Sequence, residues 1–200
     1  LQLGFVLITA NYGYSQDGSL DASFGTGGKV VTSINSGADI AYAVALQNDG
    51  KIVVAGMTTN AATGKDFACL RYNTDGTLDT SFGTNGIVTN DVQIGSDDEA
   101  YSMVIQNDGK IILAGYSDDG SNKNAALIRL NVDGSLDTSF GTSGKVLTDF
   151  MTNRADEIKT VKIHSLTGNI VVGGTSAQTS TNSRAIIARY TPAGILDTAF

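Results

Sequence analysis

Short apolar runs separated by polar turns recur along this chain, and they predict β-strands. In the first complete unit, residues 41–47 and 51–58 are largely apolar and flank a turn at 48–50, in which an Asp-Gly pair supplies positive φ. A polar loop, a third run at 66–73 and a short fourth run at 86–90 follow. No stretch shows the 3.6-residue periodicity of an amphipathic helix. The unit therefore reads as four antiparallel strands.

The same order of runs returns twice more, at a fixed spacing. The second unit has runs at 100–106, 110–116, 124–131 and 144–149, and the third at 158–164, 169–175 and 184–191. A motif of the form Ser-Leu-Asp-Thr-Ser-Phe-Gly, called the phrase below, follows the third run of each unit. Its phenylalanines recur every 58 to 60 residues, at Phe24, Phe82, Phe140 and Phe200. A period of this size is typical of repeat architectures, in which each unit buries its apolar faces against its neighbours.

Four-stranded units with two apolar faces predict an all-β fold, a β-propeller. We expect about three four-stranded blades of a longer ring, forming an open arc: residues 34–90, 91–149 and 150–200, with the last blade cut. Residues 17–33 would be an outer strand that latches the final blade, so that 16–200 form an incomplete propeller. A parallel β-helix is the alternative, but its rungs are shorter and lack recurring Asp-Gly hairpins.

Residues 1–15 lie outside the repeat. Leu1–Ala10 is apolar and uncharged and is followed by small polar residues, which is the profile of a signal peptide that lacks its basic region. The alternative is a buried strand with Leu3, Phe5 and Leu7 on one face. We therefore expect a secreted or cell-surface protein, with 1–15 as the remnant of a signal peptide. The segment is too short for a spanning helix, so no membrane insertion is expected.

Three motifs carry a resemblance to a known family. Leu-Asp-x-Ser-Phe-Gly-x-x-Gly-x-Val, Asp-Gly-Lys-Ile-Val-Val-Ala-Gly and Arg-Tyr-Asn-x-Asp-Gly together resemble the delta-60 repeat, a bacterial β-propeller repeat of unknown function. The resemblance spans nearly all of residues 17–200. It implies an exported bacterial protein, in which a C-terminal sorting domain for type IX secretion can follow, and it implies no catalytic residues.

Charge narrows the range of partners. The chain has 13 Lys and Arg against 20 Asp and Glu, a net charge of −7. Nucleic acids and anionic membranes need clustered basic residues, so neither is an expected partner. Cys69 is the single cysteine and aligns with apolar positions of the other units, which predicts a buried apolar filler.

Arginines and aspartates recur with the phrase. Arg on the third strand and Asp in the next turn predict a partly buried, bidentate ion pair in each blade, and a ligand-binding arginine is the alternative. Because a ligand rarely needs the same group in every blade, we assign these positions a structural role together with the four phenylalanines. The set is Arg71, Asp79, Arg129, Asp137, Arg189 and Asp197.

The candidate ligand-binding residues belong to two groups. Asp39, Asp98 and Asp156 precede the first strand of each unit, where they would form a carboxylate ring at a channel mouth or, alternatively, accept backbone hydrogen bonds at the crossovers. The loops 59–65, 117–123 and 176–183 differ from blade to blade, as recognition loops do. Their candidate residues are Asn60, Lys65, Asp118, Asp119 and Asn122.

Catalysis finds little support in the sequence. His164, the single histidine, stands at a hairpin without a recurring nucleophile, and no Cys/His cluster or glycine-rich phosphate loop is present. No metal or cofactor is expected, with calcium a weaker alternative. The sequence predicts a non-catalytic binding or adhesion module for a protein or glycan. The alternatives are an extracellular polysaccharide lyase or hydrolase that uses Asp98, Glu99, Asp156 and Glu157, and an architectural spacer.

Overall fold

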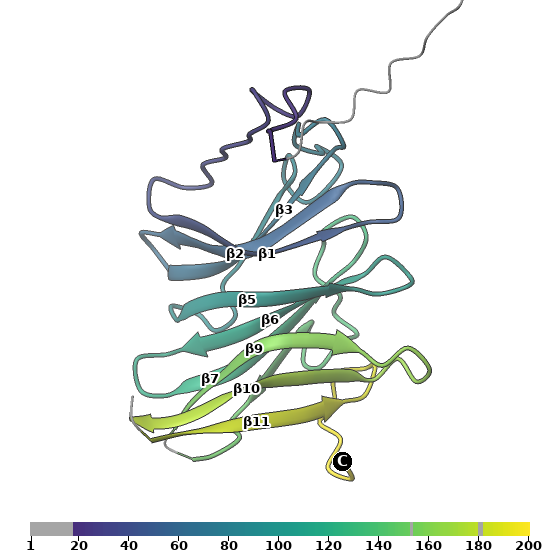
Figure 1. Cartoon of the computed structure of the whole chain (residues 1–200). Coiled ribbons are helices and arrows are strands. Elements are labelled where there is room, and N and C mark those ends of the chain that lie inside the picture. The colour runs from purple at the N-terminus through teal and green to yellow at the C-terminus, as the bar shows by residue number, and fades with distance from the viewer. Residues whose placement is uncertain (1–17, 153, 180–181) are drawn as a thin grey trace, which may run out of the picture.

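Three antiparallel sheets stack face to face in the computed structural model (Figure 1), which describes residues 18–152, 154–179 and 182–200. The predicted signal-peptide remnant, residues 1–15, lies outside the described residues. Within them, no helix is long and apolar enough to span a membrane. Each sheet is one blade, and the prediction of an all-β, open arrangement of propeller blades is confirmed.

The strands of each blade follow one another in chain order. Blade 1 contains β1 (Asp39–Leu46), β2 (Ile52–Asn60), β3 (Gly64–Tyr72) and β4 (Ile87–Asn90). Blade 2 contains β5 (Asp97–Ile105), β6 (Ile111–Asp118), β7 (Lys123–Leu130) and β8 (Lys145–Thr148). Blade 3 contains β9 (Ala155–Ile163), β10 (Ile170–Thr179) and β11 (Asn182–Tyr190), with no fourth strand among the described residues.

Alternate residues of each strand serve two different blade interfaces. In β2, Val53 and Ala55 face blade 2 and are fully buried, whereas Ile52 and Val54 face the other way, toward the N-terminal segment. In β6, Leu113 packs against blade 1 while Ile112 and its alternates pack against blade 3. Since side chains alternate across a strand, apolar residues are needed at every position of the middle strands. This explains why these runs lack a polar alternation.

The inner strands β1, β5 and β9 lie against one another along the inner edge of the arc. β1 and β5 each carry a β-bulge, and the pairing of β9 with β10 shifts register at the same place. In each blade, a glycine of the second strand lies opposite this irregularity: Gly56, Gly115 or Gly174. A Cβ added to any of these glycines would lie 1.8–1.9 Å from a carbonyl oxygen of the inner strand. Only glycine allows this approach.

The N-terminal segment, residues 18–34, forms no regular strand. The outer strand expected at 17–33 needs a final blade to pair with, and the described residues include none, so that expectation stays a prediction. The segment's β-bridge joins two of its own residues, Gly25 and Lys29, and none of the described strands pairs with it. It nevertheless packs on blade 1, where the Gly25 amide donates to the Asp75 carbonyl at 2.9 Å. Gly83 makes the same contact with blade 2 through Asp133. The segment therefore occupies the place of the phrase and outer strand of a preceding blade.

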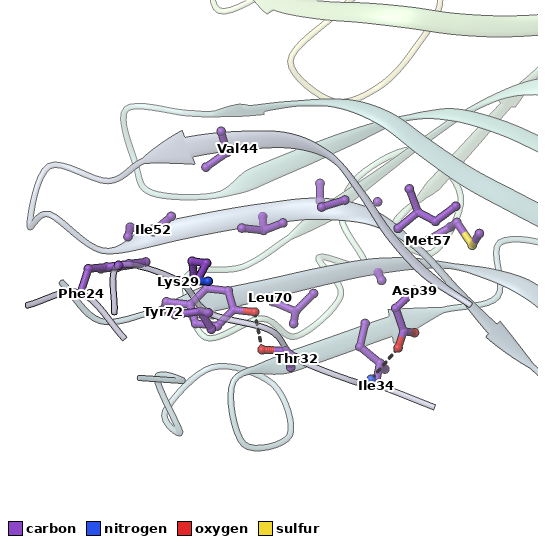
Figure 2. A pocket seen from close by; sticks show the side chains of 18 residues that line it. Phe24, Lys29, Thr32, Ile34, Asp39, Val44, Ile52, Met57, Leu70 and Tyr72 are labelled. Carbon is purple, nitrogen blue, oxygen red and sulfur yellow. Dashed lines mark hydrogen bonds between the residues drawn. The ribbon is translucent and has the colours of Figure 1, made fainter. Parts of the chain in front are cut away.

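A cavity of about 430 Å³ lies between this segment and β1, β2 and β3 (Figure 2). Its lining is mostly apolar, and Val44 beside it is 67% exposed. On blade 2, the positions that correspond to Val54 and Leu70 are Leu113 and Ile128, both buried under blade 1. The cavity is therefore the uncovered part of a blade interface, and we do not regard it as a ligand site.

Candidate functional site

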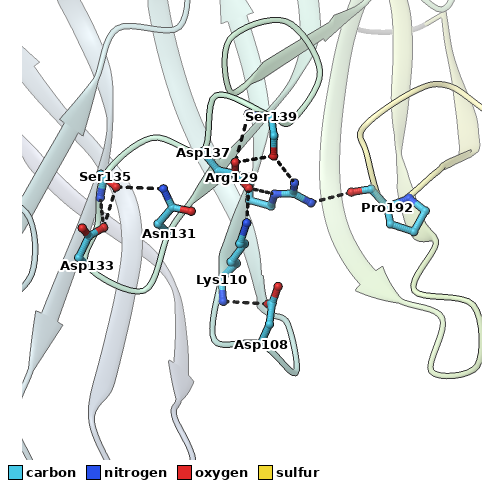
Figure 3. Close-up of polar contacts among 9 residues, drawn as sticks. All are labelled: Asp108, Lys110, Arg129, Asn131, Asp133, Ser135, Asp137, Ser139 and Pro192. Atoms are coloured by element: carbon cyan, nitrogen blue, oxygen red, sulfur yellow. Dashed lines mark hydrogen bonds and ion pairs between the residues drawn. The ribbon is translucent and has the colours of Figure 1, made fainter.

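The recurring arginine and aspartate form an ion pair in each blade, and Figure 3 shows the pair of blade 2. In blade 2, Arg129 Nε donates to Asp137 Oδ2 at 2.7 Å, and Lys110 Nζ donates to the same oxygen at 2.7 Å. The Ser139 hydroxyl and amide donate to Asp137 Oδ1. The pair is therefore not bidentate as predicted, because a serine and a lysine share the carboxylate with the arginine.

The same arginine also reaches the next blade. Arg129 Nη1 donates to the Pro192 carbonyl of blade 3 at 2.6 Å, and the guanidinium carbon lies 4.6 Å from the centre of the Phe140 ring. Arg71 makes the equivalent hydrogen bond to Val132 of blade 2. These groups are buried within the protein and tie one blade to the next, which is a structural role.

The three aspartates lie at the start of the inner strands, Asp39 in β1, Asp98 in β5 and Asp156 in β9, and they do not form an open ring. Asp98 and Asp156 are fully buried, and Asp39 is partly buried. Each accepts a backbone N–H from the crossover before it, from Ile34, Val92 or Phe150. The structure thus shows the alternative arrangement, in which the carboxylates hold the crossovers. Burial raises the pKa of Asp98 to about 6.

Most of the candidate loop residues stabilise their own loops. Asn60 Oδ1 accepts the Ala62 amide, and Asp119 Oδ1 accepts the amides of Ser121 and Asn122. These are Asx-type turns. Lys65 differs, because its Nζ reaches Glu99 of blade 2 at 2.6 Å.

Lys65 belongs to a group that the sequence did not reveal, which we call the tyrosine–glutamate cluster. It extends over all three blades near the β2–β3 and β6–β7 hairpins. Tyr42 of β1 packs edge-on against Tyr101 of β5, with ring centres 5.0 Å apart, and Tyr101 is 5.6 Å from Tyr116. The members are Tyr42, Lys65, Glu99, Tyr101, Tyr116, Lys123, Glu157 and Lys159.

Both glutamates of the cluster are held ionised. Burial alone would raise the pKa of Glu99, but hydrogen bonds from Lys65 and Tyr42 outweigh it and lower the pKa. Glu157 behaves alike, with Lys123 and Lys159 as its partners at 2.8 and 2.5 Å. Three ammonium groups and two glutamate carboxylates thus meet in the cluster, and Asp97 lies beside Lys65 as a third carboxylate.

Two lysines of the cluster also lie over aromatic rings. Lys159 Nζ is 3.7 Å from the centre of the Tyr101 ring, and Lys123 Nζ is 3.8 Å from that of Tyr116. The Tyr42 side is open to solvent, since Tyr42 is 40% exposed and the Lys159 side chain 46%. The cluster therefore presents a phenol ring and an ammonium head in fixed positions.

A polar cavity of about 340 Å³ lies between the β6–β7 loop and blade 3. Lys123 belongs both to its lining and to the cluster. Asp118 and Asn122, predicted from the sequence, line it with Arg154 and Gln178. Arg154 Nη1 is buried and has no hydrogen-bond partner in the structure.

One signal for the missed residues existed in the alignment of the repeats. Tyr42, Tyr101 and Lys159 hold the same position of their inner strands, and Lys123 holds the position in its third strand that the predicted residue Lys65 holds in blade 1. Their contact depends on how the inner strands of neighbouring blades are set against each other, which the alignment does not specify. Cys69, by contrast, is fully buried in the interface of blades 1 and 2, and burial raises the pKa of its thiol to about 12.

These features define the class of the protein as a β-propeller built from short sequence repeats. The comparisons with known proteins agree. The family model "Domain of unknown function (DUF5122) beta-propeller" matches residues 47–82, 106–140 and 167–200, more than half of the chain. The chain therefore belongs to this family, the delta-60 repeat family, with three matched repeats.

One solved structure shows a distant likeness. It is a novel alpha-L-arabinofuranosidase (CtGH43) from Clostridium thermocellum ATCC 27405, similar with a TM-score of 0.40 and 13% sequence identity. The match covers 77% of this chain, which spans only about half, 48%, of that structure. No curated protein matches the sequence.

Proposed function

We propose that this protein is an exported or cell-surface binding module that holds a glycan without cleaving it. One observation carries the proposal: the exposed Tyr42 ring and Lys159 head lie in the same cluster as Lys123, which opens onto the polar cavity. Sugars combine apolar C–H faces with many hydroxyl groups. An aromatic ring packs against the C–H faces, and ammonium, guanidinium and amide groups form hydrogen bonds with the hydroxyl groups.

The cavity extends this surface. At about 340 Å³ it falls within the roughly 300–1,000 Å³ of small-molecule sites. The side chains of Arg154, Asp118 and Gln178 line it and carry hydrogen-bond donors and acceptors. A uronate carboxylate would pair with Arg154, which favours acidic glycans over neutral ones. The export part rests on the apolar residues 1–10 and on the family resemblance.

Electrostatics supports binding over catalysis. A glycosidase acid must keep its proton near neutral pH and reach the substrate. Glu99 and Glu157 have lowered pKa values, so they do not keep a proton. Asp98 has a raised pKa but is fully buried, with both carboxylate oxygens hydrogen-bonded.

The test is calorimetric titration of the protein with neutral and uronate-containing oligosaccharides. Lys159→Ala removes one charged donor, worth about 1.5–3 kcal/mol, and is expected to weaken binding by about ten- to a hundredfold. Lys162→Ala is the matched control, because Lys162 is an exposed lysine of the same strand outside the cluster, and it should bind as the unaltered protein does.

Three outcomes contradict the proposal. Equal losses in both lysine variants would mean that general charge, and not the cluster, attracts the ligand. Release of new reducing ends or unsaturated sugars from a polysaccharide would favour the enzyme. Binding to a protein partner that Tyr42→Ala abolishes, with no glycan bound, would assign the same surface to a protein ligand.

A further inference from the structure

Three carboxylates meet where the chain crosses from blade 1 to blade 2. Asp66 lies near the start of β3, Asp91 follows β4, and Asp98 lies in β5. One oxygen from each lies within 4.8 Å of one oxygen from each of the others. Asp66 is 3% exposed and Asp98 is fully buried.

Two oxygens of this group are buried and have no partner, Asp66 Oδ1 and Asp91 Oδ1. The other oxygens are fixed. Asp66 Oδ2 accepts the Thr63 hydroxyl at 2.8 Å, and Asp91 Oδ2 accepts the Gly95 amide at 3.0 Å. Asp98 Oδ2 accepts the Val92 amide at 2.6 Å. Hydrogen bonds therefore orient all three carboxylates, while Asp66 and Asp91 each keep one oxygen that accepts no hydrogen bond.

No basic side chain neutralises these charges among the described residues. None of the ion pairs there includes any of the three aspartates, and the nearby Lys145 ammonium binds the backbone carbonyls of Asp91 and Val92. Buried like charges at such distances repel one another strongly. A cation among them removes the repulsion and satisfies the unpartnered oxygens.

We propose that Asp66, Asp91 and Asp98 bind a calcium ion that joins blades 1 and 2. Calcium takes hard oxygen ligands at about 2.3–2.6 Å, so oxygens on opposite sides of the ion lie about 5 Å apart, which suits the spacing here. The affinity expected of an extracellular module is a Kd of about 10⁻⁴–10⁻³ M. None of the three aspartates is a member of the tyrosine–glutamate cluster, so the site itself does not depend on glycan binding; only the expected affinity takes the extracellular setting from that proposal.

The repeat itself offers matched comparisons. At the crossover from blade 2 to blade 3, Asp149 and Asp156 stand where Asp91 and Asp98 do, but Asn124 replaces Asp66. Asp156 Oδ1 is also buried without a partner there, yet the third carboxylate is missing. One residue thus distinguishes a complete group from an incomplete one.

The experiment is calcium titration of the chelator-treated protein, followed by calorimetry and thermal unfolding. We expect one calcium per chain and a higher Tm, with affinity at least about tenfold weaker in Asp66→Asn and in Asp91→Asn. Asp149→Asn, the control at the second crossover, should bind as before. Asn124→Asp should raise the stoichiometry from one to two.

Several results would overturn the assignment. One is the absence of heat and of a Tm change at about 10 mM calcium, well above the expected Kd. A loss in Asp149→Asn equal to that in Asp66→Asn would place the ion elsewhere. Equal stabilisation by magnesium would exclude a calcium site. If Asp66→Asn fails to fold, as judged by circular dichroism, the more exposed Asp91→Asn decides.

Discussion

The arginine that bridges two blades offers a quantitative test of how the blades are held together. Arg129→Ala removes the 2.7 Å hydrogen bond to Asp137, the 2.6 Å hydrogen bond to the Pro192 carbonyl and the contact with the Phe140 ring. Each charge-assisted hydrogen bond contributes about 1.5–3 kcal/mol. Lys110 still pairs with Asp137, so that carboxylate is not left alone. The expected loss is about 3–5 kcal/mol.

Arg189 of blade 3 provides the matched comparison. It pairs with Asp197 and lies 4.6 Å from the Phe200 ring centre, as Arg129 does with its own partners. Its side chain is 32% exposed against 9% for Arg129, and it makes no hydrogen bond to another blade among the described residues. Solvent screening reduces the value of such a pair to about 1 kcal/mol or less. The difference between the two variants therefore isolates the cross-blade contact.

The assay is thermal unfolding followed by circular dichroism, with urea unfolding for the free energy. For a chain of this size, 1 kcal/mol corresponds to about 2–4 °C in Tm. Arg129→Ala should lower Tm by about 10 °C and Arg189→Ala by about 3 °C. If the two variants lose equal stability, or if Arg129→Ala loses less than about 1 kcal/mol, the cross-blade hydrogen bond does not contribute as described.

Two further predictions concern acid and a glycine turn. Burial alone would raise the pKa of Asp137, but hydrogen bonds, led by that from Lys110, hold it well below its ordinary value. The stabilisation is therefore present above about pH 3.9, the pKa of an unfolded aspartate, and is lost as pH falls below it. In urea unfolding, Asp137→Asn should make the free energy of unfolding fall less steeply with decreasing pH. An unchanged slope of that free energy against pH would contradict this. Gly134→Ala places a Cβ 2.8 Å from the Gly83 nitrogen at a φ of 86°, and should lower the free energy of unfolding by about 2–5 kcal/mol. Gly120→Ala has a φ of 83° but open space around the Cβ, and should lower it by about 1–2 kcal/mol. Equal losses of Tm in the two variants would refute the clash at Gly134.

The blades were predictable because their determinants are local and repeated. The Asp-Gly turns fix the hairpins, and the apolar runs on either side fix the strands, so 41–47 and 51–58 correspond closely to β1 and β2. Residues 29–33 show the limit of this reasoning. Their sequence is that of an outer strand, but a strand exists only where a partner offers backbone hydrogen bonds, and none of the described strands does so here.

The candidate sites were predictable only in part. Lys65, Asp118 and Asn122 became candidates because the loops that contain them vary between blades, and variation is visible in a sequence. Asp98 was found through its recurrence, but its role was not, because burial and a Val92 amide decide what the carboxylate does. Asp66 differs from its counterparts in the other blades, but this difference points to a cation site only because the structure places Asp66 beside Asp91 and Asp98.

The sequence by itself therefore determined the repeat, the strands, the turns and the propeller class of this protein, since these follow from side-chain alternation and turn chemistry within about sixty residues. The tertiary structure alone decided which residues of different blades meet. Tyr42 reaches Tyr101, and Asp66 reaches Asp98, across the packing of one blade on the next. That packing depends on interdigitated apolar side chains and bulged inner strands, and its geometry is not encoded in the spacing of any single motif.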